Sequence, residues 1–245
     1  LTLLGEVYEL PQEGNFEGSI HLIRRSEAGG RVDDPEVAAL QEKLLARRRE
    51  RAQPEVDEKV VSSWNALAGI GLVHAYRHLG DETALSEART LFDGLWRNHV
   101  SGDRVYHSAL AGRVKENAFL QDAAALLLFA EYLHEDTRAY GEEMRRLREL
   151  TESFHRDGRW LEGDAEDFMA IPAPIFDSPT PSATSLAELA LLRHNMMTGE
   201  LYDERPFGAP LVQDAFNIAA LAASGYVYLI ESPEPVPWKD VPIHT

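Results

Sequence analysis

The 245-residue chain contains no cysteine and has far fewer basic than acidic residues. Without cysteine it can form no disulfide, thiol nucleophile, Cys-ligated zinc site or redox pair. Its 41 acidic residues against 24 basic ones give a formal net charge of −17, and a surface of that sign repels phosphate. The charge therefore argues against nucleic acid and against an anionic membrane as partners.

Long apolar runs are also missing. The longest, residues 123–130, is far shorter than the roughly 20 residues that cross a bilayer. No basic segment followed by an apolar stretch occurs near the start, so we predict no signal peptide and expect a cytoplasmic location. The chain begins at Leu1 rather than at methionine, which indicates a processed or truncated piece. No phosphate loop, dinucleotide fingerprint or nucleophile elbow occurs, and no cofactor is predicted.

The first part of the chain is predicted to contain little helix. Residues 1–33 are interrupted by glycines and are expected to be irregular, with short strands near residues 7–8 and 20–23. A helix is predicted over residues 35–51, because Asp34 is a favoured N-cap residue and Pro35 is favoured in the first turn. We interpret its basic C-terminal half as a solvated helix end rather than a nucleic-acid patch.

Further along, two kinds of predicted helix alternate. Segments of the first kind are apolar almost all round, which predicts burial on every side: residues 64–79, 119–133, 184–197 and 212–223. Segments of the second kind carry one apolar stripe opposite a charged face: residues 82–96 and 139–154. Short aromatic segments follow them at residues 105–107 and 159–161. Asp81 and Asp136 recur about 55 residues apart, and each is predicted to open the second helix of its pair.

Buried helices that alternate with half-exposed ones predict an inner ring of helices inside an outer ring. The expected fold is mostly α, an (α/α)6 toroid of the six-hairpin glycosidase-like kind, with short β-hairpins between the helix pairs. At roughly 55 residues per pair, the chain holds about four pairs, so the ring is expected to be incomplete. We assign residues 1–230 to this partial toroid, with helical hairpins over 34–230. Proline-rich residues 231–245 are predicted to form an extended tail.

Polar residues at the starts of the buried helices form the candidate site. Helix N-termini converge on the centre of a toroid, where their free N–H groups and positive dipole ends meet. An aromatic face with nearby carboxylates and amides suits a sugar, which offers an apolar face and a rim of hydroxyls. The candidates at the three helix starts are Trp64, Asn65, Phe119, Gln121, Asp122, Ser182 and Ser185. The alternative is helix capping, for which Ser63, Ser182 and Thr184 are suitable residue types.

Asp122 is the candidate acid–base residue, because it is a carboxylate within an otherwise apolar helix face. The alternative is a first-turn carboxylate that only stabilises the helix dipole. Asp57 and Lys59 precede the first buried helix and either reach the site as a loop ion pair or lie in solvent. His107 is the histidine best placed for the site, with a structural role as the alternative.

No metal site is predicted. His74 and His78 have a helical spacing that can bind a metal, but they lie near a helix C-terminus, which favours the protonated imidazole. Gly69 and Gly71 lie inside the same apolar helix, where we attribute them to close helix packing.

Four motifs resemble a known family: residues 14–18 (GNFEG), 57–67 (DEKVVSSWNAL), 118–122 (AFLQD) and 181–185 (PSATS). They are similar in order and spacing to motifs of the thioredoxin-domain-containing family that includes spermatogenesis-associated protein 20. The resemblance implies a six-hairpin barrel related to N-acylglucosamine 2-epimerases and glycosidases. It also implies that this chain is the later part of that barrel, and that a thioredoxin-like domain and the first hairpins are missing partners.

The chain departs from the family pattern at its candidate site. Gln121 stands where the family commonly has a second acid, and Ala123 stands where it has a tyrosine. The loss of one carboxylate argues against glycoside hydrolysis by a carboxylate pair.

We therefore expect a sugar-active enzyme, epimerase- or glycosidase-like, or a sugar-binding remnant. Asp122 would act as acid–base, Trp64 as stacking platform, and Asn65, Lys59 and His107 would orient hydroxyls. The alternatives are a non-catalytic interaction scaffold whose polar residues are helix caps, and a regulatory platform for the thioredoxin-like domain.

Overall fold

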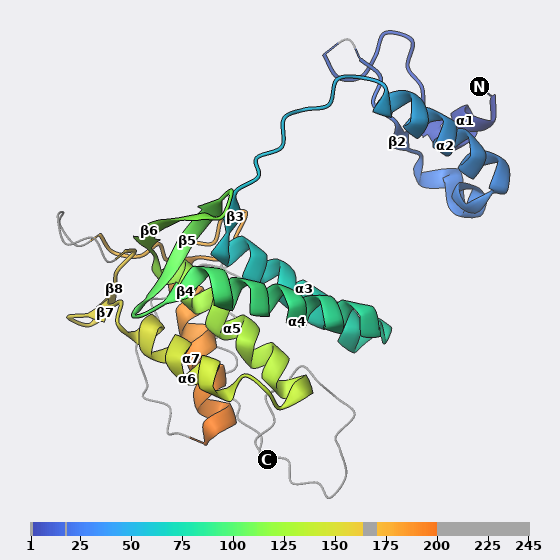
Figure 1. The fold of residues 1–245 in the computed structure, drawn as a ribbon. Coiled ribbons are helices and arrows are strands. Elements are labelled where there is room, and N and C mark those ends of the chain that lie inside the picture. Colours follow the sequence, from blue (N-terminus) through green and yellow to red (C-terminus); the bar gives the residue numbers. More distant parts are fainter. Residues whose placement is uncertain (1, 18, 164–170, 200–245) are drawn as a thin grey trace, which may run out of the picture. The chain divides into compact units, whose positions relative to one another are not determined.

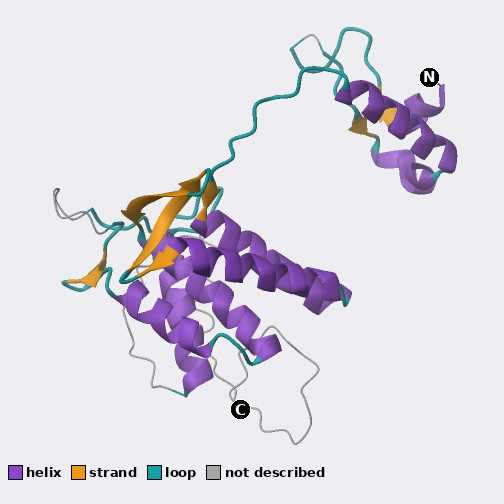
Figure 2. Cartoon of the chain, in the orientation of Figure 1, coloured by secondary structure: helices purple, strands orange, loops and turns teal. Residues whose placement is uncertain are grey.

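The structure is a computed structural model that describes residues 2–17, 19–163 and 171–199 (Figure 1). The chain divides into two compact units, Leu1–Asp57 and Glu58–Thr245. Helix predominates over strand in the described residues (Figure 2), so the predicted mostly-α class is confirmed. Within these ranges no helix combines the length and apolarity that a bilayer span requires.

The first unit is small, with its core at Val7, Ala28 and Val37. Its elements are α1 (Thr2–Val7), β1 (Tyr8–Glu9), β2 (Ile23–Arg24), the 3-10 segment η1 (Ser26–Asp33) and α2 (Pro35–Arg49). Two short strands do pair here, Tyr8 opposite Arg24 and Glu9 opposite Ile23.

Of two predictions for the first unit, one is wrong and the other is confirmed. Residues 2–7 form a helix rather than an irregular or strand-like segment, because the backbone turns to bury Leu4 and Val7 on one side. Asp34 caps α2 as predicted, its side chain accepting the Glu36 N–H at 2.8 Å, and Pro35 occupies the first turn.

The second unit contains two rows of helices (Figure 1). Its helices are α3 (Ser62–Leu79), α4 (Glu82–His99), α5 (Leu120–Thr137), α6 (Gly141–Glu152) and α7 (Ala183–Thr198). Helix α5 packs between α3 and α7, while α4 packs on α3 and α6 packs on α5. Each matches a predicted helix within a few residues. The predicted helix at residues 212–223 and the tail at 231–245 lie outside the described residues.

Short antiparallel strands lie at one end of the helices of the second unit (Figure 2). They are β3 (Val60–Val61), β4 (Val100–Ser101), β5 (Arg104–Leu110), β6 (Arg113–Ala118), β7 (His155–Arg156) and β8 (Arg159–Trp160). Strand β5 pairs with β3, β4 and β6, and β7 pairs with β8. Because β3 leads into α3 and β6 leads into α5, the larger sheet lies where these two helices begin.

Helix α5 is the centre of the core, buried along nearly its whole length from Leu120 to Leu133. Phe129 packs edge-on against Phe92 of α4, with ring centroids 5.4 Å apart. A Cβ on Gly69 of α3 would lie 2.1 Å from the Phe129 ring, so close packing explains this glycine as predicted. A Cβ on Gly71 would meet no atom within 4 Å, and the same explanation is wrong for that residue.

Helix α3 is not buried on every side, contrary to the prediction. Trp64 is 62% exposed and Leu79 is 79% exposed, and Ala68 and Gly71 lie on the same side of the helix between them. The physical reason is that α3 lies at the end of the row α3–α5–α7. Helices α4 and α5 cover two sides of α3, and no other helix of the described part of this unit packs on the third.

The predicted aspartate repeat is correct for only one member. Asp81 caps α4, its side chain accepting the Thr83 N–H at 3.0 Å. Asp136 does not open α6, because α5 continues to Thr137 and the Asp136 carboxylate accepts a hydrogen bond from Arg77 Nε at 2.7 Å.

Candidate active site

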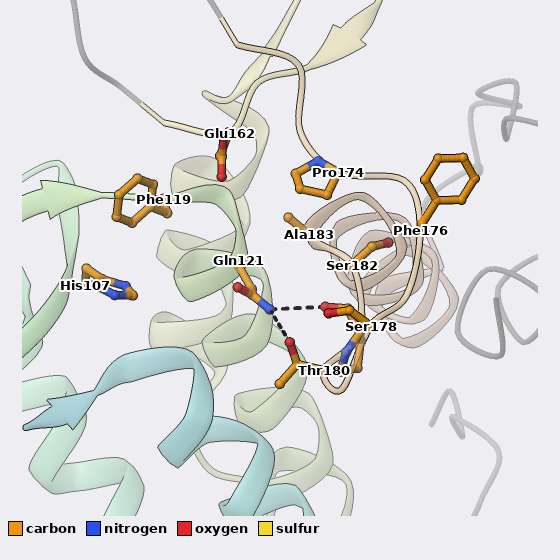
Figure 3. A pocket seen from close by; sticks show the side chains of 11 residues that line it. His107, Phe119, Gln121, Glu162, Pro174, Phe176, Ser178, Thr180, Ser182 and Ala183 are labelled. Carbon is orange, nitrogen blue, oxygen red and sulfur yellow. Dashed lines mark hydrogen bonds between the residues drawn. The ribbon is translucent and has the colours of Figure 1, made fainter. Parts of the chain in front are cut away.

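A pocket of about 240 Å³ opens where β5, the start of α5 and the segment before α7 meet (Figure 3). This volume is slightly below the roughly 300–1,000 Å³ of sites for drug-sized molecules, and it suits a smaller ligand. The lining residues are His107, Phe119, Gln121, Glu162, Pro174, Phe176, Ser178, Thr180, Pro181, Ser182 and Ala183. Figure 3 shows His107 and Phe119 on one side of the pocket and residues 174–183 on the other.

An aspartate–histidine pair lies at one side of the pocket, with His107 in its wall and Asp122 behind it. Asp122 Oδ2 lies 2.8 Å from His107 Nδ1, and Asp122 Oδ1 accepts the backbone N–H of Ser63 at 2.9 Å. The Asp122 side chain is fully buried, whereas that of His107 is 36% exposed. The carboxylate therefore bridges the start of α3 to the imidazole of β5, and only the imidazole reaches the pocket.

The contact with Asp122 changes the proton affinity of His107. The hydrogen bond that the carboxylate accepts from His107, together with its negative charge, raises the pKa of His107 above the usual histidine value. Partial burial and the positive charges of Lys115 and Lys59 act in the opposite direction. If Nδ1–H donates to the carboxylate, Nε2 is the ring nitrogen available for proton transfer to a bound molecule.

A second histidine, His99, lies behind this pair. Its Nδ1 is 2.8 Å from Ser62 Oγ, and that hydroxyl donates to the Tyr106 carbonyl. Because the hydroxyl proton is used there, the oxygen accepts from His99 Nδ1–H. Burial lowers the pKa of His99, which disfavours the charged imidazole, while the Tyr106 backbone and Asp122 act in the opposite direction. His99 was not predicted as a site residue, although it continues the buried stripe of Phe92 and Leu95 by one helical turn.

Gln121 joins the two sides of the pocket. Its Nε2 donates to Thr180 Oγ1 at 3.3 Å and to the Pro181 carbonyl at 3.1 Å, which ties the start of α5 to the segment before α7 (Figure 3). The amide oxygen of Gln121 lies on the side of the amide that faces His107 (Figure 3).

Capping explains some of the predicted serines. Ser182 caps α7, since its Oγ accepts the Ser185 N–H at 3.2 Å and lies 2.6 Å from Ser185 Oγ. Its own N–H donates to Asp177 Oδ1 at 2.9 Å. Ser63 is not an N-cap, because α3 begins one residue earlier, at Ser62, and Asp122 accepts the Ser63 N–H instead. Ser182 lines the pocket, and Ser185 is buried beneath it.

Glu162 lines the pocket and was not predicted. Its backbone is held on both sides, the carbonyl by the Leu120 N–H at 3.0 Å and the N–H by the Ile171 carbonyl at 2.8 Å. Its side chain lies between the Phe119 side and the Pro174 side in Figure 3. No local signal could have identified it, because this contact between the end of one hairpin and the start of α5 is tertiary.

Four other predicted site residues do not line the pocket. Trp64 is exposed on α3, and Asn65 Nδ2 donates to the Val61 carbonyl at 2.8 Å within the same helix start. Lys59 is exposed at the beginning of the second unit, close enough to influence His107 electrostatically. Asp57 is exposed at the end of the first unit. The structure thus brings together His107, Phe119, Gln121 and Ser182, with Asp122 behind them.

A second polar cluster lies at the opposite ends of α3, α5 and α7. Glu135 of α5 accepts hydrogen bonds from Arg77 of α3 and from Arg193 of α7, each at 2.7 Å. Both guanidinium groups also lie over the ring of Tyr132, at 5.0 and 4.2 Å from its centroid. The Arg77 side chain is only 1% exposed, and those of Glu135 and Arg193 are nearly as buried. We call these four residues the closed cluster.

Glu131 lies one helical turn before Glu135 on the same helix. It is completely buried, and His194 Nδ1 of α7 is 3.6 Å from its Oε1. Burial raises the pKa of Glu131 well above the usual value, Arg193 opposes this shift, and Glu135 adds to it.

His74 and His78 lie with stacked rings 5.7 Å apart on α3. Among the described residues no three acidic or histidine side chains gather as metal ligands would.

Comparison of the chain with known proteins gives no relative from which a role could be transferred: no family model matches it, and no curated protein matches it. The residues of the pocket therefore carry the functional argument.

Proposed function

We propose that the chain is a sugar-active protein whose pocket binds a small polar ligand, with His107 as the residue that transfers a proton. The observation that carries this proposal is the contact between buried Asp122 and half-exposed His107, whose imidazole lines the pocket. A general acid–base residue needs access to its ligand and a partner that sets its tautomer. His107 has both.

The composition of the wall supports a sugar as ligand. Phe119 and Phe176 offer apolar surface for the face of a sugar ring, and the Gln121 amide with the Ser178 and Thr180 hydroxyls offers partners for its hydroxyl groups. Glu162 adds one carboxylate to this set. The aromatic role that the sequence analysis gave to Trp64 passes to these two phenylalanines in our proposal.

Asp122 acts in this proposal as a positioning residue, not as the acid–base itself. Both of its oxygens accept hydrogen bonds, from Ser63 and His107, and neither is exposed. A hydrolase of the two-carboxylate kind needs two carboxyl groups at the bond that breaks. Within the described part of the chain Glu162 is the single acidic residue lining this pocket, so we favour an epimerase-like isomerisation, in which a proton leaves and returns, over hydrolysis.

The wider family assignment remains part of the proposal. The inner row α3–α5–α7 backed by α4 and α6 has the order expected of three consecutive hairpins in a toroid. Together with the resemblance of the four motifs, this order supports a partial (α/α)6 ring. The proposed missing partners are a thioredoxin-like domain and further hairpins.

The experiment is a screen for binding and for proton exchange. Sugar binding is measured by a glycan array and calorimetry, and incorporation of solvent deuterium into bound aldoses and ketoses is followed by NMR in D2O. We expect exchange in the parent chain and a loss of about 100-fold or more in His107→Gln. Absence of sugar binding would overturn the proposal, and binding without any exchange would leave a binding protein in place of an enzyme.

Asp122→Asn separates positioning from general stability. The variant keeps a side chain of the same size but loses the charge that raises the pKa of His107. We therefore expect that pKa to fall, as measured by NMR titration of the His107 ring proton, together with slower exchange. A merely structural role would lower the free energy of unfolding and leave the His107 titration unchanged in the folded protein.

A second candidate function is a docking scaffold. The exposed face of α3, with Trp64 and Leu79 both more than half exposed, is the observation that favours it. Trp64→Ser with Leu79→Ser would then abolish capture of a partner without altering sugar binding or deuterium exchange. Loss of exchange in this double variant would argue for the enzyme instead.

A further inference from the structure

The charged residues that line the pocket do not suit a site that binds anions. Among the described residues that line it, His107 and Glu162 are the ionisable ones, and neither lysine nor arginine occurs. Proteins bind phosphate and carboxylate groups with arginine, lysine or clustered backbone N–H groups. This wall offers a carboxylate in their place.

The Asp122–His107 pair does not make the pocket positively charged. When His107 is protonated, its charge is cancelled by the carboxylate 2.8 Å away, and when it is neutral the buried carboxylate remains. In both protonation states Glu162 leaves the pocket with net negative charge. Lys59 and Lys115 are near enough to act on His107, but neither lines the pocket.

The backbone sets the position of Glu162 beside the pocket. Two backbone hydrogen bonds, with Leu120 and Ile171, fix its main chain, and its side chain lines the pocket (Figure 3). Phe119 lines the pocket beside His107, and Phe176 lines it from the segment before α7 (Figure 3). Aromatic faces and a carboxylate around one small space are the surroundings that a protonated amine prefers.

We infer that the pocket selects a polyhydroxylated ligand carrying a protonated amine, an amino sugar, and that Glu162 is the residue that recognises the amine. This inference rests on the proposed sugar-type function of the pocket. It predicts a rank order set by charge at constant ring size: an amino sugar binds best, a neutral sugar less well and an acidic sugar worst.

The test compares four probes on the whole chain: glucosamine, glucose, N-acetylglucosamine and glucuronate. Binding is followed through the NMR shift of the His107 ring proton and by calorimetry, at about pH 6.5 so that the amine is protonated. We expect glucosamine to bind about fivefold or more tightly than glucose, and glucuronate more weakly than either. The preference is expected to shrink as salt rises from about 20 mM to about 500 mM, because salt screens partly exposed charges.

Glu162→Gln is the decisive variant, and Glu87→Gln on the exposed surface of α4 is its matched control. We expect the fivefold preference to vanish in the first and persist in the second, with both variants folded by circular dichroism. Equal binding of glucose and glucosamine by the parent chain, or an unchanged preference in Glu162→Gln, would overturn the amine assignment while leaving the sugar pocket intact. Failure of all four probes to bind would overturn the proposed function itself, and this inference with it.

Discussion

The two ends of the helix row α3–α5–α7 use similar residues for different purposes. At one end Asp122 of α5 holds the start of α3 and an imidazole that remains 36% exposed. At the other end Glu135 of the same helix holds Arg77 and Arg193, with all three side chains under a tenth exposed. Each carboxylate bridges α5 to neighbouring elements, but only the first has a partner with access to a pocket.

This difference shows what separates a structural ion pair from a candidate site. Strong hydrogen bonds and perturbed pKa values occur at both ends, because buried charges need partners wherever they are. In the closed cluster the guanidinium groups and the Tyr132 ring stack together. At the open end the geometry leaves one side of the imidazole facing a pocket, and access is what permits chemistry.

The largest effect is expected from breaking the closed cluster. Glu135→Ala removes the carboxylate shared by two buried guanidinium groups, and such a loss typically costs about 3–5 kcal/mol of the free energy of unfolding. Chemical denaturation measures it. Glu87→Ala on the solvent-exposed side of α4 is the control and should change stability by less than about 0.5 kcal/mol. A loss below about 1 kcal/mol in the free energy of unfolding of Glu135→Ala would show that the closed cluster stabilises the fold no more than the open end does.

The next effect tests the contact that joins the two ends. Gly69 lies on α3 between Ser63 and Arg77, and a methyl group there would overlap the buried Phe129 ring. We expect Gly69→Ala to cost about 1–3 kcal/mol through overpacking. Gly71→Ala, two residues along the same helix, should be neutral or stabilise by up to about 1 kcal/mol, because its Cβ enters open space and alanine favours helix. Equal losses in both would mean that α3 and α5 are not in close contact.

A smaller stability change is expected at the open end. His107→Gln should alter the free energy of unfolding by less than about 1 kcal/mol, because the side chain is more than a third exposed. The raised pKa of His107 predicts the sign of a pH effect. Its stabilising contribution is present below the unfolded-state pKa and is lost as pH rises through the folded-state pKa. Denaturation curves across that range should lose this slope in the variant.

The smallest change in stability is expected from Glu131→Gln at acidic pH. The pKa of Glu131 is raised in the folded chain. Its contribution to the free energy of unfolding is therefore fully present below its usual pKa of 4.5, where the carboxyl group is protonated in both the folded and the unfolded chain. As pH rises above that value the parent chain should lose stability relative to the variant. Melting temperatures at several pH values measure the difference. A parent chain that instead gained on the variant with rising pH would contradict a neutral, buried Glu131.

Much of the fold could be predicted from local patterns. Apolar periodicity predicted the five helices in the described part of the second unit within a few residues, since burial of one or all faces imposes a helical repeat on the sequence. Capping chemistry likewise predicted the starts of α2 and α4 at Asp34 and Asp81. The errors arose where neighbours decide, as at Asp136, which pairs with Arg77 instead of opening a helix.

The candidate site was predictable only in part. The sequence singled out Asp122, His107, Gln121 and Phe119 as polar or aromatic residues near helix starts, and these four come together. Their roles were not visible, because the 2.8 Å contact between Asp122 and His107 joins a helix to a strand of the sheet. Glu162 could not have been chosen from the sequence for the same reason.

By itself, the sequence determined a chain without thiol chemistry, with a strongly acidic composition and with a series of helices whose positions follow apolar periodicity. These properties follow from composition and periodicity, which act residue by residue. Only the tertiary structure decided which carboxylate is sealed and which holds an accessible histidine. Burial and access depend on what packs against a side chain, and for Asp122, Glu135 and Glu162 the neighbours come from distant parts of the chain.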